Sequence, residues 1–160
     1  MNKLEKFHNL VEIIKKTKIS KSNVNFIPRQ TLSININNQT YYISLICDDS
    51  FQLPVVILDN QFNIVNKLLD IEGDRASITI MQNFLYIFTD NKVSMYDINN
   101  LSNFPTILGL GNLNIQSICS NQNNIFAYSL AKDKIIKYDK NIFPVEEYEN
   151  PYSKKLFISL

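Results

Sequence analysis

Residues 84–97 read FLYIFTDNKVSMYD, and residues 125–139 read IFAYSLAKDKIIKYD. Each stretch consists of an apolar run, a polar turn and a second run that ends in Tyr-Asp. The pairs Tyr96-Asp97 and Tyr138-Asp139 lie about 42 residues apart, and self-similarity at such a period indicates repeated supersecondary units. Two apolar runs around a short polar turn are typical of antiparallel strands. The repeat therefore predicts an all-β protein.

The same arrangement extends outward into three units of about 40 residues. The units cover residues 31–74, 75–112 and 113–150, and turns of Asn, Asp and Gln join their strands. The chain has only three glycines, and Asn replaces them because it tolerates the left-handed backbone of tight turns. The predicted strands are residues 31–36, 40–46, 54–59 and 62–69, then 76–81, 84–89, 92–97 and 104–108, then 115–119, 124–129, 134–138 and 143–147. A further strand is predicted at residues 154–159, and Pro28 is placed in a connector.

The N-terminus has a different periodicity. Its apolar residues recur at spacings of three and four, which places them on one face of a helix over residues 3–18. They are Leu4, Phe7, Leu10, Val11 and Ile14. We therefore divide the chain into an N-terminal amphipathic helix and break, residues 1–22, and a repeat domain, residues 23–160.

The formal net charge of +1 is unevenly distributed. Lysines outnumber acidic residues within residues 1–22, whereas residues 23–149 are acidic on balance. A basic arm on an acidic body can meet an acidic partner, a membrane surface or nucleic acid, and a solvated helix face explains the same pattern.

The two cysteines, Cys47 and Cys119, lie within or beside apolar runs. We expect two buried free thiols, which fit a reducing compartment, although a disulfide between them stays open. With His8 as the only histidine and no CxxC pair, the sequence predicts no metal site and no cofactor. The sequence shows neither a signal-peptide pattern nor an apolar stretch of membrane-spanning length, so we expect a soluble, cytoplasmic protein.

Four short antiparallel strands at this period resemble a blade of a β-propeller. The run Asp90–Asp97 is similar to the end of a WD40 or PQQ-like repeat, where a turn Asp precedes an apolar strand that closes with an aromatic residue and an Asp. The run Asp133–Asp139 repeats this match. The resemblance covers residues 29–160 and implies a β-propeller-like array of about three four-stranded antiparallel blades after the N-terminal helix. The chain lacks the Gly-His pair, any Trp and a Gly-rich outer turn, and the resemblance implies no particular activity.

Three blades are fewer than the four to eight that usually close a propeller. The edge strands of an open arc are unpaired and invite association. We therefore expect that the arc pairs with a copy of itself, that a larger assembly completes it, or that the sheets pack in another way. Two three-bladed arcs would give a six-bladed ring, a hypothesis that the mass in solution tests.

The acidic residues do not identify a catalytic pair. Asp97 and Asp139 recur at matching positions, so we interpret them as caps that accept hydrogen bonds from turn N–H groups. Asp48-Asp49 can bind a divalent cation, but acidic residues do not alternate there as in a cation-binding loop, so a turn is favoured. Glycosidase chemistry needs two carboxylates across a cleft, and nothing in the sequence selects them.

Two other groups of side chains can contact a ligand. The cluster Glu146, Glu147 and Glu149 can bind a basic partner or a metal, or it can form a solvated edge that repels strand pairing. Six tyrosines can line a sugar- or peptide-binding surface, or they can pack across strands. They are Tyr41, Tyr42, Tyr86, Tyr96, Tyr128 and Tyr138.

The sequence therefore predicts a non-enzymatic protein-binding or scaffold module that acts through self-association or assembly with a protein partner. We place partner binding on the helix over residues 3–18, where an apolar face can dock into a groove. The residues proposed for this role are Phe7, Val11, Ile14, Lys15 and Lys16. The helix can instead cover the open end of the arc, or lie on a membrane surface.

Two other functions remain as alternatives. One is a carbohydrate-binding, lectin-like oligomeric module with tyrosines as stacking platforms. The other is a hydrolase whose acid pair the sequence does not identify. Nucleic-acid binding is not favoured, because the repeat domain is acidic and lacks aromatic residues interleaved with Lys and Arg.

Overall fold

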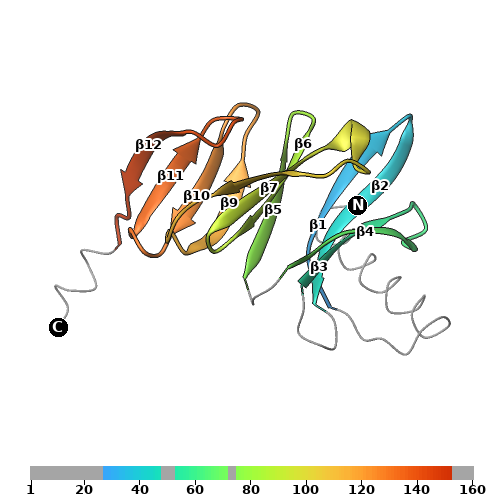
Figure 1. Cartoon of the computed structure of the whole chain (residues 1–160), viewed down its shortest axis with the longest axis horizontal. Coiled ribbons are helices and arrows are strands. Elements are labelled where there is room, and N and C mark those ends of the chain that lie inside the picture. The colour runs from blue at the N-terminus through green and yellow to red at the C-terminus, as the bar shows by residue number, and fades with distance from the viewer. Residues whose placement is uncertain (1–26, 48–52, 72–74, 153–160) are drawn as a thin grey trace. The chain divides into compact units, whose positions relative to one another are not determined.

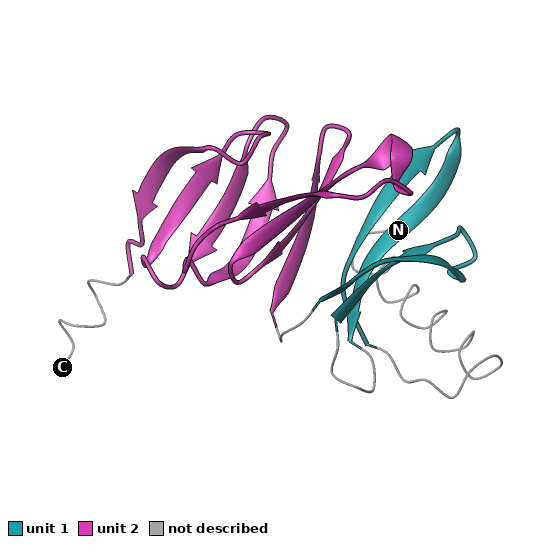
Figure 2. Ribbon diagram, viewed as in Figure 1, with its two compact units in different colours: residues 1–74 teal, residues 75–160 magenta. Residues whose placement is uncertain are grey.

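The computed structural model describes residues 27–47, 53–71 and 75–152, which form three four-stranded antiparallel sheets (Figure 1). In every sheet the strands follow one another in sequence order, as the repeat predicts. We call these sheets the first, second and third blades. The chain divides into two compact units, residues 1–74 with the first blade and residues 75–160 with the other two (Figure 2).

Three predictions lie outside the described residues. They are the helix over residues 3–18, the boundary after residue 22 and the strand at residues 154–159.

The first blade consists of β1 (Ile27–Ile36), β2 (Gln39–Cys47), β3 (Leu53–Leu58) and β4 (Ile64–Ile71). Asn37 and Asn38 close the β1–β2 hairpin with φ angles of 50° and 61°. Two consecutive residues with positive φ match the right-handed twist of the flanking strands, and Asn enters this region more easily than most residues. The prediction that Asn replaces Gly in the turns is confirmed here.

The second blade consists of β5 (Ala76–Met81), β6 (Phe84–Thr89), β7 (Lys92–Asp97) and β8 (Thr106–Gly109), with a short 3-10 helix η1 (Ile98–Asn100) after β7. The third blade consists of β9 (Ile115–Ser120), β10 (Ile125–Ser129), β11 (Lys134–Tyr138) and β12 (Pro144–Glu149). The first strands of these two blades, β5 and β9, lie side by side. The hydroxyls of Thr79 and Ser120 share a hydrogen bond of 2.7 Å between them.

The core of the second unit lies between its two blades. Tyr86 and Phe88 on β6 are 0% and 1% exposed, and they pack in one cluster with residues of β10 and β11. Burying aromatic side chains of this size stabilises the fold by about 1.5–3 kcal/mol each. The buried members of the cluster are Met81, Tyr86, Phe88, Val93, Ile115, Ile125, Ala127, Ile136, Tyr138 and Ile142.

The Asp that ends the third strand of each blade caps the turn that follows. Asp139 Oδ1 accepts hydrogen bonds from the N–H groups of Asn141 and Phe143 at 2.8 and 3.0 Å. Asp59 Oδ1 accepts from the N–H groups two and four residues later, both at 2.9 Å. Asp97 Oδ1 accepts from the N–H of Asn99 at 2.9 Å. The capping interpretation is therefore confirmed, because a carboxylate after a strand satisfies turn N–H groups that lack a ladder partner.

These turns correct two predicted strand starts. Phe62 and Ile142 occupy left-handed positions with φ angles of 63° and 64°, so β4 and β12 begin after the turns rather than at Phe62 and Phe143. In the second blade β8 likewise begins at Thr106, after Phe104. The apolar character of these aromatic residues indicated a strand, but Phe62 and Phe143 belong to five-residue turns that begin at Asp59 and Asp139.

Pro28 was also wrongly predicted. It lies within β1 rather than in a connector, and the pairing with β2 shifts register between Pro28 and Gln30. β1 is the edge strand of its sheet, where a proline that cannot donate to the ladder is tolerated.

Candidate functional site

The third blade has one face that no other blade of its unit covers. In the register of β10 with β11, Ile125 and Ala127 lie on the face that packs against the second blade. The alternate residues, Phe126 and Tyr128, therefore point away from the second blade. We call this side the back face. Cross-strand partners place these residues on it: Ser117, Cys119, Phe126, Tyr128, Ile135, Lys137, Glu146 and Tyr148. All eight are partly or largely exposed.

The repeat shows why this exposure is unusual. When the two Tyr-Asp pairs are aligned, Tyr96 corresponds to Tyr138. Their cross-strand partners, Leu85 and Ile125, therefore correspond to each other. The next residues, Tyr86 and Phe126, correspond as well. Phe88 corresponds to Tyr128 by the same alignment. The second-blade pair is completely buried by the third blade, whereas the third-blade pair remains partly exposed. The back face therefore carries aromatic residues at the positions that are buried in the second blade, but none of the blades that the structure describes in this unit packs against it.

The back face is nearly neutral in charge. Its single lysine, Lys137, lies 3.5 Å from the carboxylate of Glu146, and the two residues are cross-strand partners. The hydroxyl of Tyr148 donates to Glu146 at 2.6 Å, and this bond, followed by the charge of Lys137, holds the pKa of Glu146 below its ordinary value. A neutral, partly aromatic surface can bind protein without a large electrostatic desolvation penalty.

The predicted glutamate cluster is divided between two faces. Glu147 and Glu149 lie on the opposite side of β12 from Glu146, where Glu147 binds Lys132 at 2.6 Å and Glu149 binds Lys134 at 3.1 Å. The hydrogen bond donated by Lys132 lowers the pKa of Glu147, and the hydrogen bond that Lys134 donates to Glu149 raises the pKa of Lys134. Because lysines neutralise all three carboxylates, the solvated-edge interpretation fits better than a metal site.

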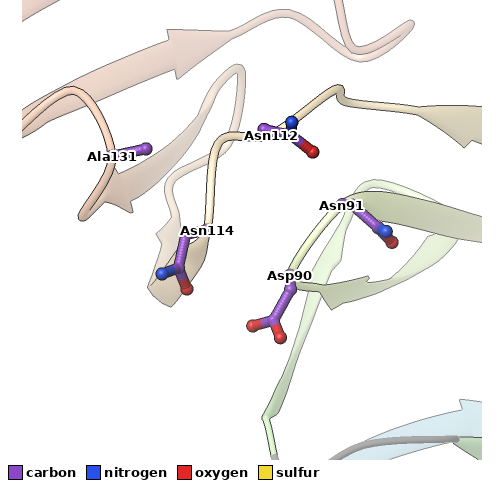
Figure 3. A pocket seen from close by; sticks show the side chains of 5 residues that line it. All are labelled: Asp90, Asn91, Asn112, Asn114 and Ala131. Carbon is purple, nitrogen blue, oxygen red and sulfur yellow. The ribbon is translucent and has the colours of Figure 1, made fainter.

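A shallow pocket of about 330 Å³ lies beside three connecting segments of the second unit (Figure 3). Asp90 and Asn91 come from the β6–β7 turn, Asn112 and Asn114 from the β8–β9 connection, and Ala131 from the β10–β11 turn. The main chain holds the segments together, since the N–H of Leu110 donates to Asn91 O at 2.7 Å and that of Leu130 donates to Asn114 O at 3.1 Å.

Asp90 is the distinctive group of this pocket. Its Oδ1 is buried and accepts no hydrogen bond from the described residues. The side-chain oxygen of Asn114 is already engaged, because it accepts from Arg75 at 3.0 Å and from Gln116 at 2.7 Å. The pocket can therefore accept one donor at Asp90, such as a water molecule, but it offers no second carboxylate for acid–base or metal chemistry.

Several predicted sites receive no structural test. The proposed partner-binding residues Phe7, Val11, Ile14, Lys15 and Lys16 lie outside the described residues, as do His8, Asp48 and Asp49. In residues 27–47, 53–71 and 75–152, the side chains of His, Cys, Asp and Glu do not gather in groups of three that could hold a metal ion. The same ranges contain no helix of the length and apolar character needed to cross a bilayer.

The tyrosines mostly follow the packing interpretation. Tyr86, Tyr96 and Tyr138 are buried, and Tyr42 stacks on Phe62 with ring centroids 4.8 Å apart. Tyr128 lies on the back face, where its hydroxyl donates to Asp133 at 2.8 Å. A sugar-stacking platform would need these rings at the surface, so the lectin-like alternative loses three of its six candidates.

The predicted burial of the two cysteines was wrong. Neither forms a disulfide, but Cys47 is only partly buried and Cys119 is exposed. It is the cross-strand partner of Phe126, so it lies on the back face. An apolar run does not indicate which of its faces is covered, and the aligned repeats were the signal that could have identified this surface.

Comparisons with known proteins support the fold. No protein-family model matches the chain, and no curated protein matches it by sequence. A solved structure of a nidogen–laminin complex is similar over 77% of this chain, with a TM-score of 0.55 and 11% identity. The chain spans 47% of the length of that structure. Two Hsv2 structures from Kluyveromyces lactis align with TM-scores of 0.46 and 0.44, at 10% and 11% identity, over 81% and 70% of this chain and 52% and 47% of theirs.

The three sheets and the similarity to the nidogen–laminin structure show an all-β fold of four-stranded antiparallel blades, similar to part of a β-propeller.

Proposed function

We propose that this chain is a non-enzymatic protein-binding or scaffold module, and that the back face of the third blade is its binding surface. The observation that carries the proposal is the contrast between two aromatic pairs in the same repeat position. Tyr86 and Phe88 are completely buried by the next blade, whereas Phe126 and Tyr128 are partly exposed. A protein that covers Phe126 and Tyr128 would gain about 25 cal/mol of binding free energy for each Å² of apolar surface that it buries.

The character of the face supports a protein rather than a small polar ligand. Phe126, Tyr128, Ile135 and Tyr148 supply aromatic and aliphatic contacts, which are the residue types enriched at the centre of protein interfaces. The fold is compatible with such a role, since the similar nidogen structure is a complex with laminin. The face carries no pair of carboxylates across a cleft, so the hydrolase alternative has no favoured residues there.

Comparative co-purification tests the proposal. The tagged full-length chain and the double variant Phe126→Ser/Tyr128→Ser are each recovered from cells. The proteins bound to each are then quantified, including other copies of the chain. Phe104→Ser is the matched control, because Phe104 is fully exposed in the same unit but lies outside the back face. We expect the double variant to lose its partners and the control to retain them. Equal recovery from all three proteins contradicts the proposal.

The helix predicted over residues 3–18 is a second candidate binding element. The change Phe7→Ser/Val11→Ser would remove two of its proposed anchors while leaving the back face unchanged. If this variant alone loses the partner, the N-terminal helix rather than the third blade is the binding surface.

A further inference from the structure

We propose that residues 155–160 of this chain dock on the back face of the third blade, beside β9, in the way that β9 docks beside β5. The segment lies outside the described residues, so its place is inferred from the repeat. The inference goes beyond the proposed function, because it concerns the β9 side of the back face rather than the partner that contacts Phe126 and Tyr128.

The contact between β5 and β9 is the template for this docking. The two strands lie side by side in the second unit. Ser120 on β9 shares a hydrogen bond of 2.7 Å with the hydroxyl of Thr79 and donates to the carbonyl of Ile80 at 3.0 Å. Ile118, on the same side of β9, packs against the core between the two blades. Thr79 is only 7% exposed beneath this strand.

The third blade has the same position at its surface. Thr79 pairs with Tyr86 across the sheet, and Cys119 pairs with Phe126. Because Tyr86 and Phe126 correspond in the repeat, Cys119 corresponds to Thr79. Cys119 is exposed, whereas Thr79 is almost completely buried. The surface around Cys119 therefore fits a strand that takes the place of β9.

The two connections between blades have the same length. Each runs from the fourth strand of one blade to the first strand of the next, and matched residues measure it. In β4 and β8 these residues are Asn66 and Thr106, the cross-strand partners of the residues two positions before the turn Asp. Thr79 follows Asn66 by 13 residues, and Cys119 follows Thr106 by 13 residues. A connection of constant length places each new strand at a constant distance along the chain.

The same length assigns the next strand to the residues after β12. Glu146 is the matched residue of β12, because its cross-strand partner lies two positions before Asp139. Ser159 follows Glu146 by 13 residues, so it corresponds to Thr79 and Cys119. The residue before this position is isoleucine in all three stretches, namely Ile78, Ile118 and Ile158. Spacing and residue type therefore both make the segment the counterpart of β9.

The chain also begins to leave the third blade as it leaves the second. After β8, the N–H of Leu110 donates to the carbonyl of Asn91 in the β6–β7 turn at 2.7 Å. After β12, the side chain of Asn150 donates to Asp133 in the β10–β11 turn at 2.8 Å. Leu110 and Asn150 occupy matching positions, so each connection contacts the matching turn with the matching residue.

The two connections differ at the next residue. Gly111 has a φ of 66°, which the ring of Pro151 forbids. The third connection instead turns after Asn150, where the N–H of Tyr152 donates to the side-chain oxygen of Asn150 at 3.1 Å. The turn is therefore different, whereas the number of residues between the strands is the same.

The segment has suitable side chains for this contact. Alternation along a strand places Ile158 and Leu160 on the side that Ile118 and Ser120 occupy in β9. Leu160 would then lie beside Cys119, so an apolar contact would replace the hydrogen bond between the two hydroxyls of the template. The contact would bury apolar surface of the segment and of the back face together.

The charged residue at the start of the segment also has a counterpart. Lys155 corresponds to Ile115, whose N–H donates to the main chain of the β6–β7 turn at 3.3 Å. Lys155 would therefore lie beside the β10–β11 turn, which carries the oppositely charged Asp133. Lys132 of the same turn is paired with Glu147 at 2.6 Å. The approach of Lys155 is therefore electrostatically compatible with docking.

Disulfide trapping with adjacent cysteines tests the register. Leu160→Cys and Ser159→Cys are made separately in full-length chain with Cys47→Ser, so that Cys119 is the only other thiol. The two positions have nearly the same reach, but their side chains point to opposite sides of a strand. We expect an intramolecular disulfide from position 160 to Cys119, because the template oxygens lie 2.7 Å apart, and little from position 159. Equal trapping, or preferential trapping from position 159, contradicts the inference.

Alkylation of Cys119 provides a second measurement in chains that keep their native cysteines. We expect slow alkylation in the native chain and several-fold faster alkylation in Ile158→Asp, quantified by peptide mass. Ser153→Asp adds the same charge before the segment and should stay slow. Equal rates in the three proteins argue against docking. When isotopically light and heavy Leu160→Cys chains are mixed before oxidation, a disulfide that joins the two forms likewise rules out docking within one chain.

Recovery of partners with Phe126→Ser/Tyr128→Ser separates this inference from the proposed function. The segment contains no counterpart of the Asp139 turn, whose Lys140 carbonyl contacts Tyr86 in the template, so Phe126 and Tyr128 stay available to a partner. If position 160 is not trapped but the double variant loses its partners, only this inference fails. If position 160 is trapped but the double variant keeps its partners, only the proposed function fails.

Discussion

The hydroxyl of Tyr86 donates a hydrogen bond of 2.8 Å to the main-chain carbonyl of Lys140, which lies 54 residues later in the chain. Tyr86 is completely buried on β6, and Lys140 lies in the Asp turn after β11. The bond therefore joins the second blade to the third. It satisfies a buried hydroxyl that could not remain unpaired without a penalty.

Removing this hydroxyl should weaken the contact between the blades. In Tyr86→Phe the ring keeps its packing, but the carbonyl of Lys140 loses its partner. We expect the free energy of unfolding to fall by about 1–2 kcal/mol, measured by chemical denaturation. Tyr41→Phe is the matched control, since its hydroxyl bonds to exposed Gln39, and a change below about 0.5 kcal/mol is expected there. Equal losses in the two variants would show that the Lys140 contact adds nothing.

The buried tyrosines make stability sensitive to alkaline pH. Burial, and for Tyr86 also the nearby charge of Asp139, raises the pKa of Tyr86 above the ordinary value of 10.0, and burial likewise raises the pKa of Tyr96 and Tyr138. A tyrosine whose pKa is higher in the folded than in the unfolded chain contributes its full stability below the unfolded pKa. This contribution is lost as pH rises from the unfolded pKa through the folded pKa. We expect the melting temperature to fall between about pH 9 and pH 11. Tyr86→Phe should show a shallower fall than the native chain, and an identical slope would contradict the assignment.

Ile142 combines a left-handed backbone with a buried side chain. At a φ of 64° a β-branched residue is strained by about 1–2 kcal/mol, which glycine would relieve. Truncating a buried Ile costs about 2–5 kcal/mol, so Ile142→Gly should be destabilising overall. Asn38→Gly, at a φ of 61° in an exposed turn, should instead be neutral or stabilising by a few tenths of a kcal/mol. The melting temperatures of both variants, measured by thermal denaturation, test these expectations. A higher melting temperature for Ile142→Gly would show that relief of backbone strain outweighs the loss of packing.

The buried oxygen of Asp90 gives a prediction about the pocket. Asp90→Asn keeps the shape of the side chain and removes the charge of the carboxylate. The Oδ1 atom of that carboxylate accepts no hydrogen bond from the described residues. We expect the free energy of unfolding to rise by about 1 kcal/mol, because a neutral amide is less costly to desolvate than a carboxylate that lacks a hydrogen-bond donor. Asp97→Asn, in an exposed turn of the same blade, should instead weaken the cap on Asn99. A loss of stability in Asp90→Asn would indicate that a water molecule or a cation pairs with the carboxylate.

Much of the fold was predictable because its signals are local. The twelve-strand pattern, the capping role of Asp97 and Asp139, and the use of Asn in left-handed turns each depend on residues within about five positions of one another. The strand starts predicted at Phe62 and Phe143 were wrong for the same reason, since an apolar residue in a turn looks like a strand residue whatever backbone conformation the turn imposes.

The amino-acid sequence by itself determined the repeat, the all-β class and the chemistry of each turn, because hydrophobic alternation and turn preferences act between neighbouring residues. Only the tertiary structure decided which face of each sheet is covered. Phe126 and Cys119 follow the same pattern as Tyr86 and Thr79, yet the first pair is accessible and the second pair is buried. The difference depends on whether another blade packs against the face, and that contact joins residues about 40 or more positions apart.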